Sequence, residues 1–139
     1  SPQLSSGPLC AMPLPETSKM EASLITCYIR YMIDPNKLAE FEHYARLWIP
    51  LVQKYGGTHH GYFLPREAPP SAGFSFPGIG EEGPKNVAVA LFSFHTQEAY
   101  QTYRQKAAED ADCQTAAAYY KETKCFLKYE RSFMTPVFK

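Results

Sequence analysis

Apolar side chains follow a different spacing in each part of the chain, and this spacing predicts alternating strands and helices. Residues 24–33 and 86–95 are rich in β-branched and aromatic side chains on both faces, as in interior strands covered on two sides. In residues 124–134 apolar side chains alternate with polar ones, which favours an edge strand. The stretch Gly56–Pro65 starts with a helix-ending glycine pair and predicts a further strand at the other edge.

Between these strands, apolar residues recur at steps of three and four, which indicates helices that bury one face. The first helix begins after the N-cap candidate Asp34 and runs to Tyr55. Its apolar stripe consists of Leu38, Phe41, Ala45, Trp48, Val52 and Tyr55. The second helix begins after Thr96, is interrupted at 110–112 and continues to Glu122.

The resulting order, β-α-β-β-α-β, predicts an α+β fold of the ferredoxin-like class. We expect right-handed crossovers to place strands 24–33 and 86–95 side by side and parallel, with both helices on one sheet face. The opposite face is then apolar and uncovered, which marks an interaction surface. A homodimer that packs sheet to sheet is therefore expected.

Two proline-rich segments stand apart from this pattern. Residues 1–22 are predicted to be a flexible arm, with leader residues as one interpretation, and residues 23–139 to be the folded domain. Residues 66–85 form a long hairpin connection, and loops of this length are often lids or partner-binding segments. We expect its Phe74, Phe76 and Ile79 to cover a pocket mouth or to contact a partner subunit.

Charge and cysteine content exclude several classes of protein. The formal net charge is zero and no run of Lys or Arg occurs, so nucleic-acid binding is not expected. No apolar run reaches the length of a membrane span. The four cysteines have neither C-x-x-C nor zinc-site spacing, which is typical of reduced structural thiols in a cytoplasmic protein.

A small-molecule site between the sheet and its helices is the leading functional hypothesis. Because side chains alternate along a strand, His60 and Tyr62 are predicted to share one face while His59 points to the other. His60 would take a proton from a phenolic or enolic substrate, with Tyr62 beside it and Arg30 stabilising the resulting anion. The candidate binding residues are Tyr28, Trp48, His59, Phe92 and Tyr129.

Several alternatives stay open beside this hypothesis. Metal binding is not expected, since adjacent strand histidines diverge. No cofactor is expected either, with haem held by His60 or His43 as the alternative. Arg30 can instead form a cross-strand ion pair with Glu130. A non-catalytic scaffold that recruits a partner through the proline-rich arm and the 66–85 loop is the second functional reading.

Four segments of the chain, 26–31, 46–50, 56–62 and 129–133, carry a resemblance to a known family. Over about 24–137 the chain resembles a single-domain, bacterial-type NIPSNAP domain of the dimeric α/β barrel superfamily. The resemblance implies ferredoxin-like protomers that dimerise through their sheets. The superfamily includes cofactor-free monooxygenases, haem-degrading enzymes and plain binding proteins. The resemblance therefore implies a homodimeric small-molecule-binding protein. A monooxygenase-like activity on a hydrophobic or aromatic substrate is one of the functions it allows.

Overall fold

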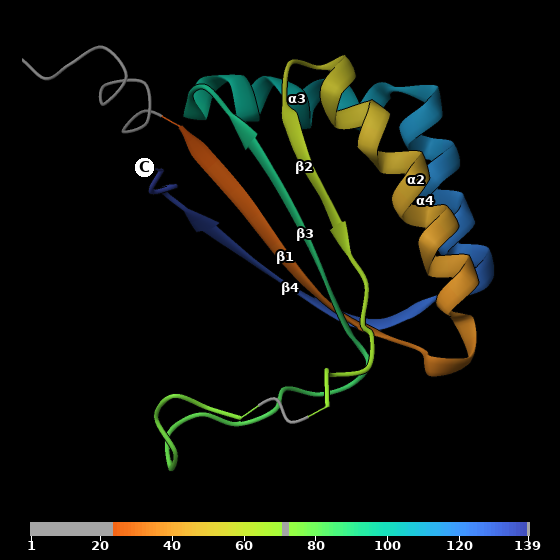
Figure 1. Cartoon of the computed structure of the whole chain (residues 1–139). Helices are drawn as coiled ribbons and strands as arrows, with labels where there is room; N and C mark the ends of the chain where they lie inside the picture. The colour runs from red at the N-terminus through yellow and green to blue at the C-terminus, as the bar shows by residue number, and fades with distance from the viewer. Residues whose placement is uncertain (1–23, 71–72, 139) are drawn as a thin grey trace, which may run out of the picture.

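The computed structural model describes residues 24–70 and 73–138 and contains the predicted order of elements (Figure 1). The predicted arm, 1–22, lies outside the described residues. The bounds are β1 (Ile25–Ile33), the 3-10 turn η2 (Pro35–Lys37), α2 (Leu38–Lys54), β2 (Thr58–Phe63), β3 (Val87–Phe94), α3 (Gln97–Glu109), α4 (Ala111–Thr123) and β4 (Phe126–Met134).

The four strands form one sheet in the order β2-β3-β1-β4, and every neighbouring pair is antiparallel. The predicted neighbours β1 and β3 are therefore confirmed, but their parallel direction is wrong. The physical reason lies in the connection through α2, which makes β1 and β2 parallel and separates them by one strand position in the sheet. The intervening β3 follows β2 through a hairpin connection and so runs opposite to both.

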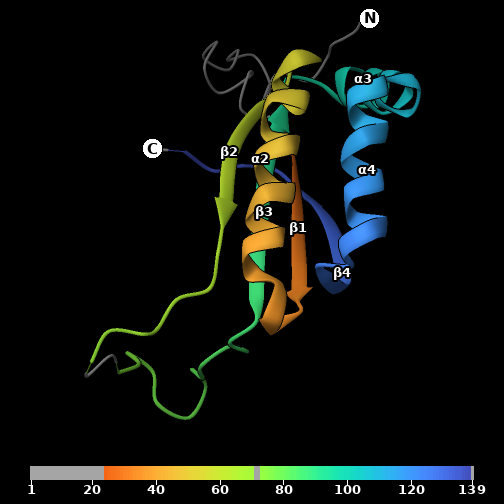
Figure 2. The same cartoon turned by 90° about the vertical axis from the view of Figure 1, so that its right-hand side faces the viewer.

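The helices begin where their caps predict. Asp34 Oδ1 accepts a hydrogen bond from the Asn36 N–H at 3.0 Å, and Thr96 Oγ1 accepts one from the Ala99 N–H at 3.0 Å. Figures 1 and 2 show α2, α3 and α4 on the same face of the sheet. Phe41 of α2 is fully buried against that face. Burial of such a ring contributes about 1.5–3 kcal/mol to folding.

An extra residue interrupts β2. His59 lies opposite Phe92 of β3, but the next residue in register with β3 is Gly61, opposite Leu91. His60 is thus left over, as in a β-bulge, and Gly61 has a φ of +116°. The bulge reverses the alternation of side chains, so that positions 59 and 62 come to the same face of the sheet.

The sheet face opposite the helices is apolar along its two central strands, as the sequence predicts. Half-buried side chains of β1 and β3 line it: Tyr28, Met32, Val87, Val89 and Leu91. Arg30 lies on the same face, where its Nη1 is 3.1 Å from Glu130 Oε1 of β4. The predicted cross-strand ion pair is therefore confirmed.

The connection between β2 and β3 extends away from the helices, beyond the end of the sheet (Figures 1 and 2). Phe76 and Ile79 in this loop are 70% and 82% exposed. None of the described helices is both long enough and apolar enough to cross a membrane.

Candidate functional site: an aromatic cavity between sheet and helices

A cavity of about 580 Å³ lies between the helix-covered face of the sheet and the three helices. Every strand and each of α2, α3 and α4 contributes to its wall. Aromatic side chains dominate the lining, and they are Tyr31, Tyr44, Trp48, Tyr62, Phe92, Tyr100, Tyr103, Tyr120, Phe126 and Tyr129. A concave apolar site with a few polar groups is the usual form of a small-molecule site.

His59 presents a hydrogen-bond donor to this cavity. The backbone N–H of Gly61 donates to His59 Nδ1 at 2.9 Å, so Nδ1 is unprotonated and the neutral ring carries its proton on Nε2. Burial, and then the charge of His60, lower the pKa of His59 to about 4. At neutral pH His59 is therefore an uncharged donor. Its enclosed Nε2 has no partner among the described residues.

A second enclosed donor lies on α2. Nε1 of Trp48 is buried and makes no hydrogen bond within the described chain. Burial raises the pKa of the neighbouring Tyr44 hydroxyl, and the Trp48 N–H lowers it to a smaller extent, although the two groups do not meet hydrogen-bond geometry. An unsatisfied buried donor costs about 1–3 kcal/mol. The cavity wall thus holds two such donors, His59 and Trp48.

The buried tyrosines and the buried thiol of the cavity are neutral at physiological pH. Burial raises the pKa of Tyr62, Tyr31 and Tyr103 well above the ordinary tyrosine value. It also raises the pKa of the Cys27 thiol to about 11, against the nearby positive charges of Arg131 and Arg104. The deep wall therefore offers hydroxyls and a thiol, but no anion.

Five of the residues proposed from the sequence line this cavity together: Trp48, His59, Tyr62, Phe92 and Tyr129. The rings of His59 and Tyr62 stack with centroids 5.1 Å apart and planes 15° apart. Their binding roles stay predictions, but their proximity is a feature of the structure.

The other three proposed residues face away from the cavity. The prediction that His60 and Tyr62 share a face is wrong, because the bulge at His60 shifts the alternation by one. His60 Nε2 instead lies 2.8 Å from Ser93 Oγ, on the face opposite the helices. Tyr28 and Arg30 lie on that face as well, so neither lines the cavity.

Two further expectations change with this geometry. His43, proposed with His60 as a haem ligand, is exposed on α2 and packs beside Tyr119. Neither histidine lines the cavity. The lid prediction for the 66–85 loop is wrong for this cavity. Its residues line a separate hollow of about 760 Å³ at the far end of the sheet.

The basic residues of the lining were not among those predicted from the sequence. Arg104 follows Tyr100 by one helical turn, and Arg131 alternates with Glu130, so both positions point toward the buried side of their elements. This spacing relative to Tyr100 and Glu130 is the feature of the sequence that could have placed both arginines in the lining. Among the described residues, no group of three or more His, Cys, Asp or Glu side chains is placed to hold a metal ion.

Comparisons with known proteins agree with the fold. A family model described as NIPSNAP matches residues 27–138. A comparison with curated proteins gives no significant match. Among solved structures, a NIPSNAP family protein of unknown function from Agrobacterium tumefaciens has a TM-score of 0.61 at 15% identity, over 83% of this chain and 89% of that one.

Two other structures extend the comparison. An uncharacterized NIPSNAP-like domain protein from Burkholderia xenovorans has a TM-score of 0.58 at 17% identity, over 84% of this chain and 87% of that one. A Nitrosomonas europaea protein named "Putative antibiotic biosynthesis monooxygenase" has a TM-score of 0.56 at 8% identity, over 84% and 93%. At these identities the likeness concerns the fold alone.

Proposed function

Since the chain belongs to the NIPSNAP family, we propose that it is a homodimeric small-molecule-binding protein whose cavity takes an aromatic or hydrophobic ligand. One observation carries this proposal: the enclosed donors His59 Nε2–H and Trp48 Nε1–H make no hydrogen bond within the described chain. A flat ligand with a carbonyl or similar oxygen supplies the missing acceptor, and its ring packs on the aromatic wall.

Trp48 makes the test direct, because it is the only tryptophan of the chain and it lines the cavity. Acetonaphthone, an uncharged aromatic ketone, should quench Trp48 fluorescence on binding, and ethylnaphthalene, which lacks the oxygen, should bind more weakly. His59→Phe removes the donor and keeps an aromatic ring. We expect it to weaken acetonaphthone binding roughly tenfold, the worth of about one hydrogen bond.

The matched control is His60→Ala, which changes the neighbouring histidine on the opposite sheet face. Its affinity for acetonaphthone should stay within about twofold of the wild-type value, a free-energy difference of about 0.4 kcal/mol. Equal losses in both variants, or no quenching of Trp48 by either probe, would contradict the proposal.

A monooxygenase-like reaction would use the same donors. In cofactor-independent oxygenation the enol or phenol loses its proton, here to solvent, and the resulting anion reacts with O2. Buried N–H donors stabilise the negative charge on the oxygen of that anion. His59, and not His60, would contact the substrate in this reaction. It would donate a hydrogen bond and not act as a base, because its Nε2 already carries the proton. Oxygen uptake with a naphthalenediol, lost in His59→Phe, would assign an enzyme. Binding without uptake would assign a binding protein.

The dimer is the second part of the proposal. The apolar outer face of β1 and β3 supports it, since a sheet face of this kind is normally covered. We also place the protein in a reducing, cytoplasmic setting, which is consistent with the buried free thiols Cys27, Cys113 and Cys125.

A scaffold role through the 66–85 loop is favoured by its exposed apolar side chains, of which Ile79 is the most exposed. Replacing the loop with a short hairpin turn separates the two functions. Because none of its described residues lines the cavity, ligand affinity should be unchanged. A protein partner bound by the wild type and lost by this variant would support the scaffold.

A further inference from the structure

The cavity lining carries positive charge without any carboxylate. Its charged residues come from three elements, and they are Arg104 of α3, Lys121 of α4, and Lys128 and Arg131 of β4. The whole chain has no net charge, so this is a local concentration of one sign. Such a concentration lowers the free energy of a bound anion and attracts anions toward the site.

Most of this positive charge is not neutralised by ion pairs. Lys128 Nζ lies 3.6 Å from Glu130 Oε2, but Arg104, Lys121 and Arg131 have no ion pair among the described residues. The Arg131 guanidinium lies 5.2 Å from the centre of the Phe133 ring. This cation–π contact limits its motion and leaves its N–H donors available.

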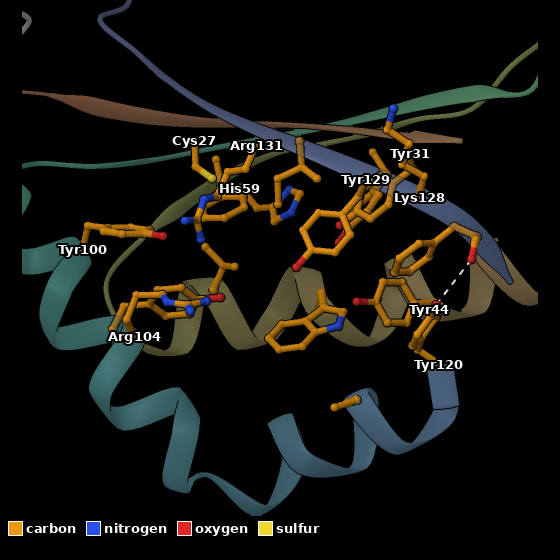
Figure 3. Close-up of a pocket in the computed structure, with 18 of the residues that line it drawn as sticks. Cys27, Tyr31, Tyr44, His59, Tyr100, Arg104, Tyr120, Lys128, Tyr129 and Arg131 are labelled. Carbon is orange, nitrogen blue, oxygen red and sulfur yellow. Dashed lines mark hydrogen bonds between the residues drawn. The ribbon is translucent and has the colours of Figure 1, made fainter. Parts of the chain in front are cut away.

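The two arginines lie at the same end of the cavity. Both act on the Cys27 thiol, whose pKa their positive charges lower against the stronger effect of burial. In Figure 3 this end holds Cys27, His59, Tyr100, Arg104 and Arg131. The opposite end holds Tyr44, Tyr120, Lys128 and Tyr129. The site is thus polarised, with two guanidinium groups near His59.

We propose that the ligand of this cavity is an aromatic carboxylate whose carboxylate group is bound by Arg104 and Arg131. This inference rests on the proposed small-molecule function and adds the charge of the ligand. A guanidinium fork matches a carboxylate in two parallel hydrogen bonds, and two arginines on different elements fix its position. The aromatic body then lies along Trp48 and Tyr129, where the wall is apolar and ring-lined.

The test compares naphthoate with naphthamide, which has the same ring system and a similar shape but no charge. Titration calorimetry on the full chain at low salt should show naphthoate binding roughly tenfold or more tightly, as expected for charge-assisted hydrogen bonds. The difference should shrink as salt is added, because the arginines are exposed enough to be screened.

Arg104→Gln and Arg131→Gln should each bring naphthoate affinity toward that of naphthamide, and leave naphthamide affinity unchanged. The matched control is Arg46→Gln on α2, an exposed arginine that pairs with Glu42 at 2.6 Å and does not line the cavity. Its naphthoate affinity should equal that of the wild type. Unchanged thermal midpoints in all three variants would show that the fold is intact.

The outcomes separate this inference from the proposed function. If naphthamide binds as tightly as naphthoate, the carboxylate inference is wrong while the small-molecule function stands. If acetonaphthone, naphthamide and naphthoate all fail to bind, the function itself is wrong. Naphthyl phosphate binding tenfold more tightly than naphthoate would overturn the choice of carboxylate in favour of a phosphate ester.

Discussion

Gly61 has a φ of +116°, a conformation that residues with a side chain rarely adopt, and its backbone N–H holds the His59 ring. A Cβ at this position would meet no atom within 4 Å, so the cost of a substitution comes from the backbone alone. We expect Gly61→Ala to lower the free energy of unfolding by about 1–2 kcal/mol, measured by urea denaturation.

Gly83→Ala provides the control for this substitution. A Cβ at Gly83 would meet no atom within 4 Å and Gly83 has no positive φ, so its replacement should change stability by less than about 0.5 kcal/mol. Equal stability of the Gly61→Ala variant and the wild type would show that the bulge does not need a glycine.

Cys27 offers a second measurement at this scale. Because burial raises the pKa of its thiol from 9.0 to about 11, the thiolate fraction at neutral pH falls roughly a hundredfold. Iodoacetamide should therefore label Cys27 slowly in the folded protein and quickly in urea, as read by peptide mass spectrometry. Rapid labelling of Cys27 in the folded chain at neutral pH would contradict its burial.

The residues that the sequence could place are those that depend on regular spacing. Trp48 lies on the helical stripe, and Phe92 and Tyr129 lie on strand alternation, so their positions follow from the pattern. His59 and His60 could not be assigned in the same way, because alternation assumes an uninterrupted strand. A glycine inside a strand, here Gly61, is the signal that this assumption can fail.

At the scale of elements, Asp110 joins α3, α4 and the end of α2. Its carboxylate caps α4 by accepting from the N–H groups of Asp112 and Cys113, at 2.7 and 3.1 Å. It also accepts from Lys54 Nζ at 2.7 Å and from the Tyr55 hydroxyl. The side chain is only 6% exposed, so this cluster fixes the helical layer that forms one wall of the cavity.

These hydrogen bonds, first those from Lys54 and Tyr55, hold the pKa of Asp110 below its ordinary value. A lowered folded-state pKa adds stability that is complete above the unfolded pKa of about 4 and is lost as pH falls toward the folded pKa. Asp110→Asn should therefore lower the urea midpoint at pH 7, and should show less further loss than the wild type on acidification below about pH 4.

Asp112→Asn is the control for this effect. Asp112 lies on α4, the helix that Asp110 caps, is 75% exposed and is 3.9 Å from Lys54 Nζ. It should change neither the midpoint at pH 7 nor its acid dependence appreciably. If the urea midpoints of the wild type and Asp110→Asn depend on pH in the same way, the hydrogen bonds of Asp110 do not contribute to stability.

Element order and helix limits could be read from the sequence, since caps such as Asp34 and Thr96 act locally. Strand direction and the place of the loop could not. The antiparallel pairing of β1 with β3 follows from insertion of β3 between two parallel strands, which is a relation between distant segments. The 66–85 loop likewise leaves the sheet at the end away from the cavity, as no local pattern indicates.

At the scale of the whole molecule, the outer sheet face gives a test of assembly. Leu91 is half-buried in the centre of that face, opposite Tyr28 of β1. We expect Leu91→Asp to convert a dimer into a monomer, measured by sedimentation velocity, because a carboxylate cannot be buried there unpaired. Gln101→Asp, on an exposed turn of α3, should leave the dimer unchanged.

A wild-type chain that sediments as a monomer at every concentration would contradict the dimer.

The positive charge of the cavity lining is also a property of the whole molecule. Arg104, Lys121 and Arg131 are far apart in sequence and the total charge is zero, so no run of residues indicates the basic lining of the cavity. Only the packing of α3 and α4 over β4 brings these side chains together.

The bulge in β2 has a consequence for how the two sheet faces can vary. With His60 deleted, His59 and Tyr62 would stand two positions apart in an unbroken strand, and an even separation keeps them on one side. His59 and Tyr62 therefore lie on the same face of the sheet with or without the extra residue. If the cavity binds naphthoate as proposed, a chain lacking His60 should keep that affinity while its outer sheet face loses an imidazole. Length changes at this point can therefore remodel the outer sheet face independently of the cavity wall.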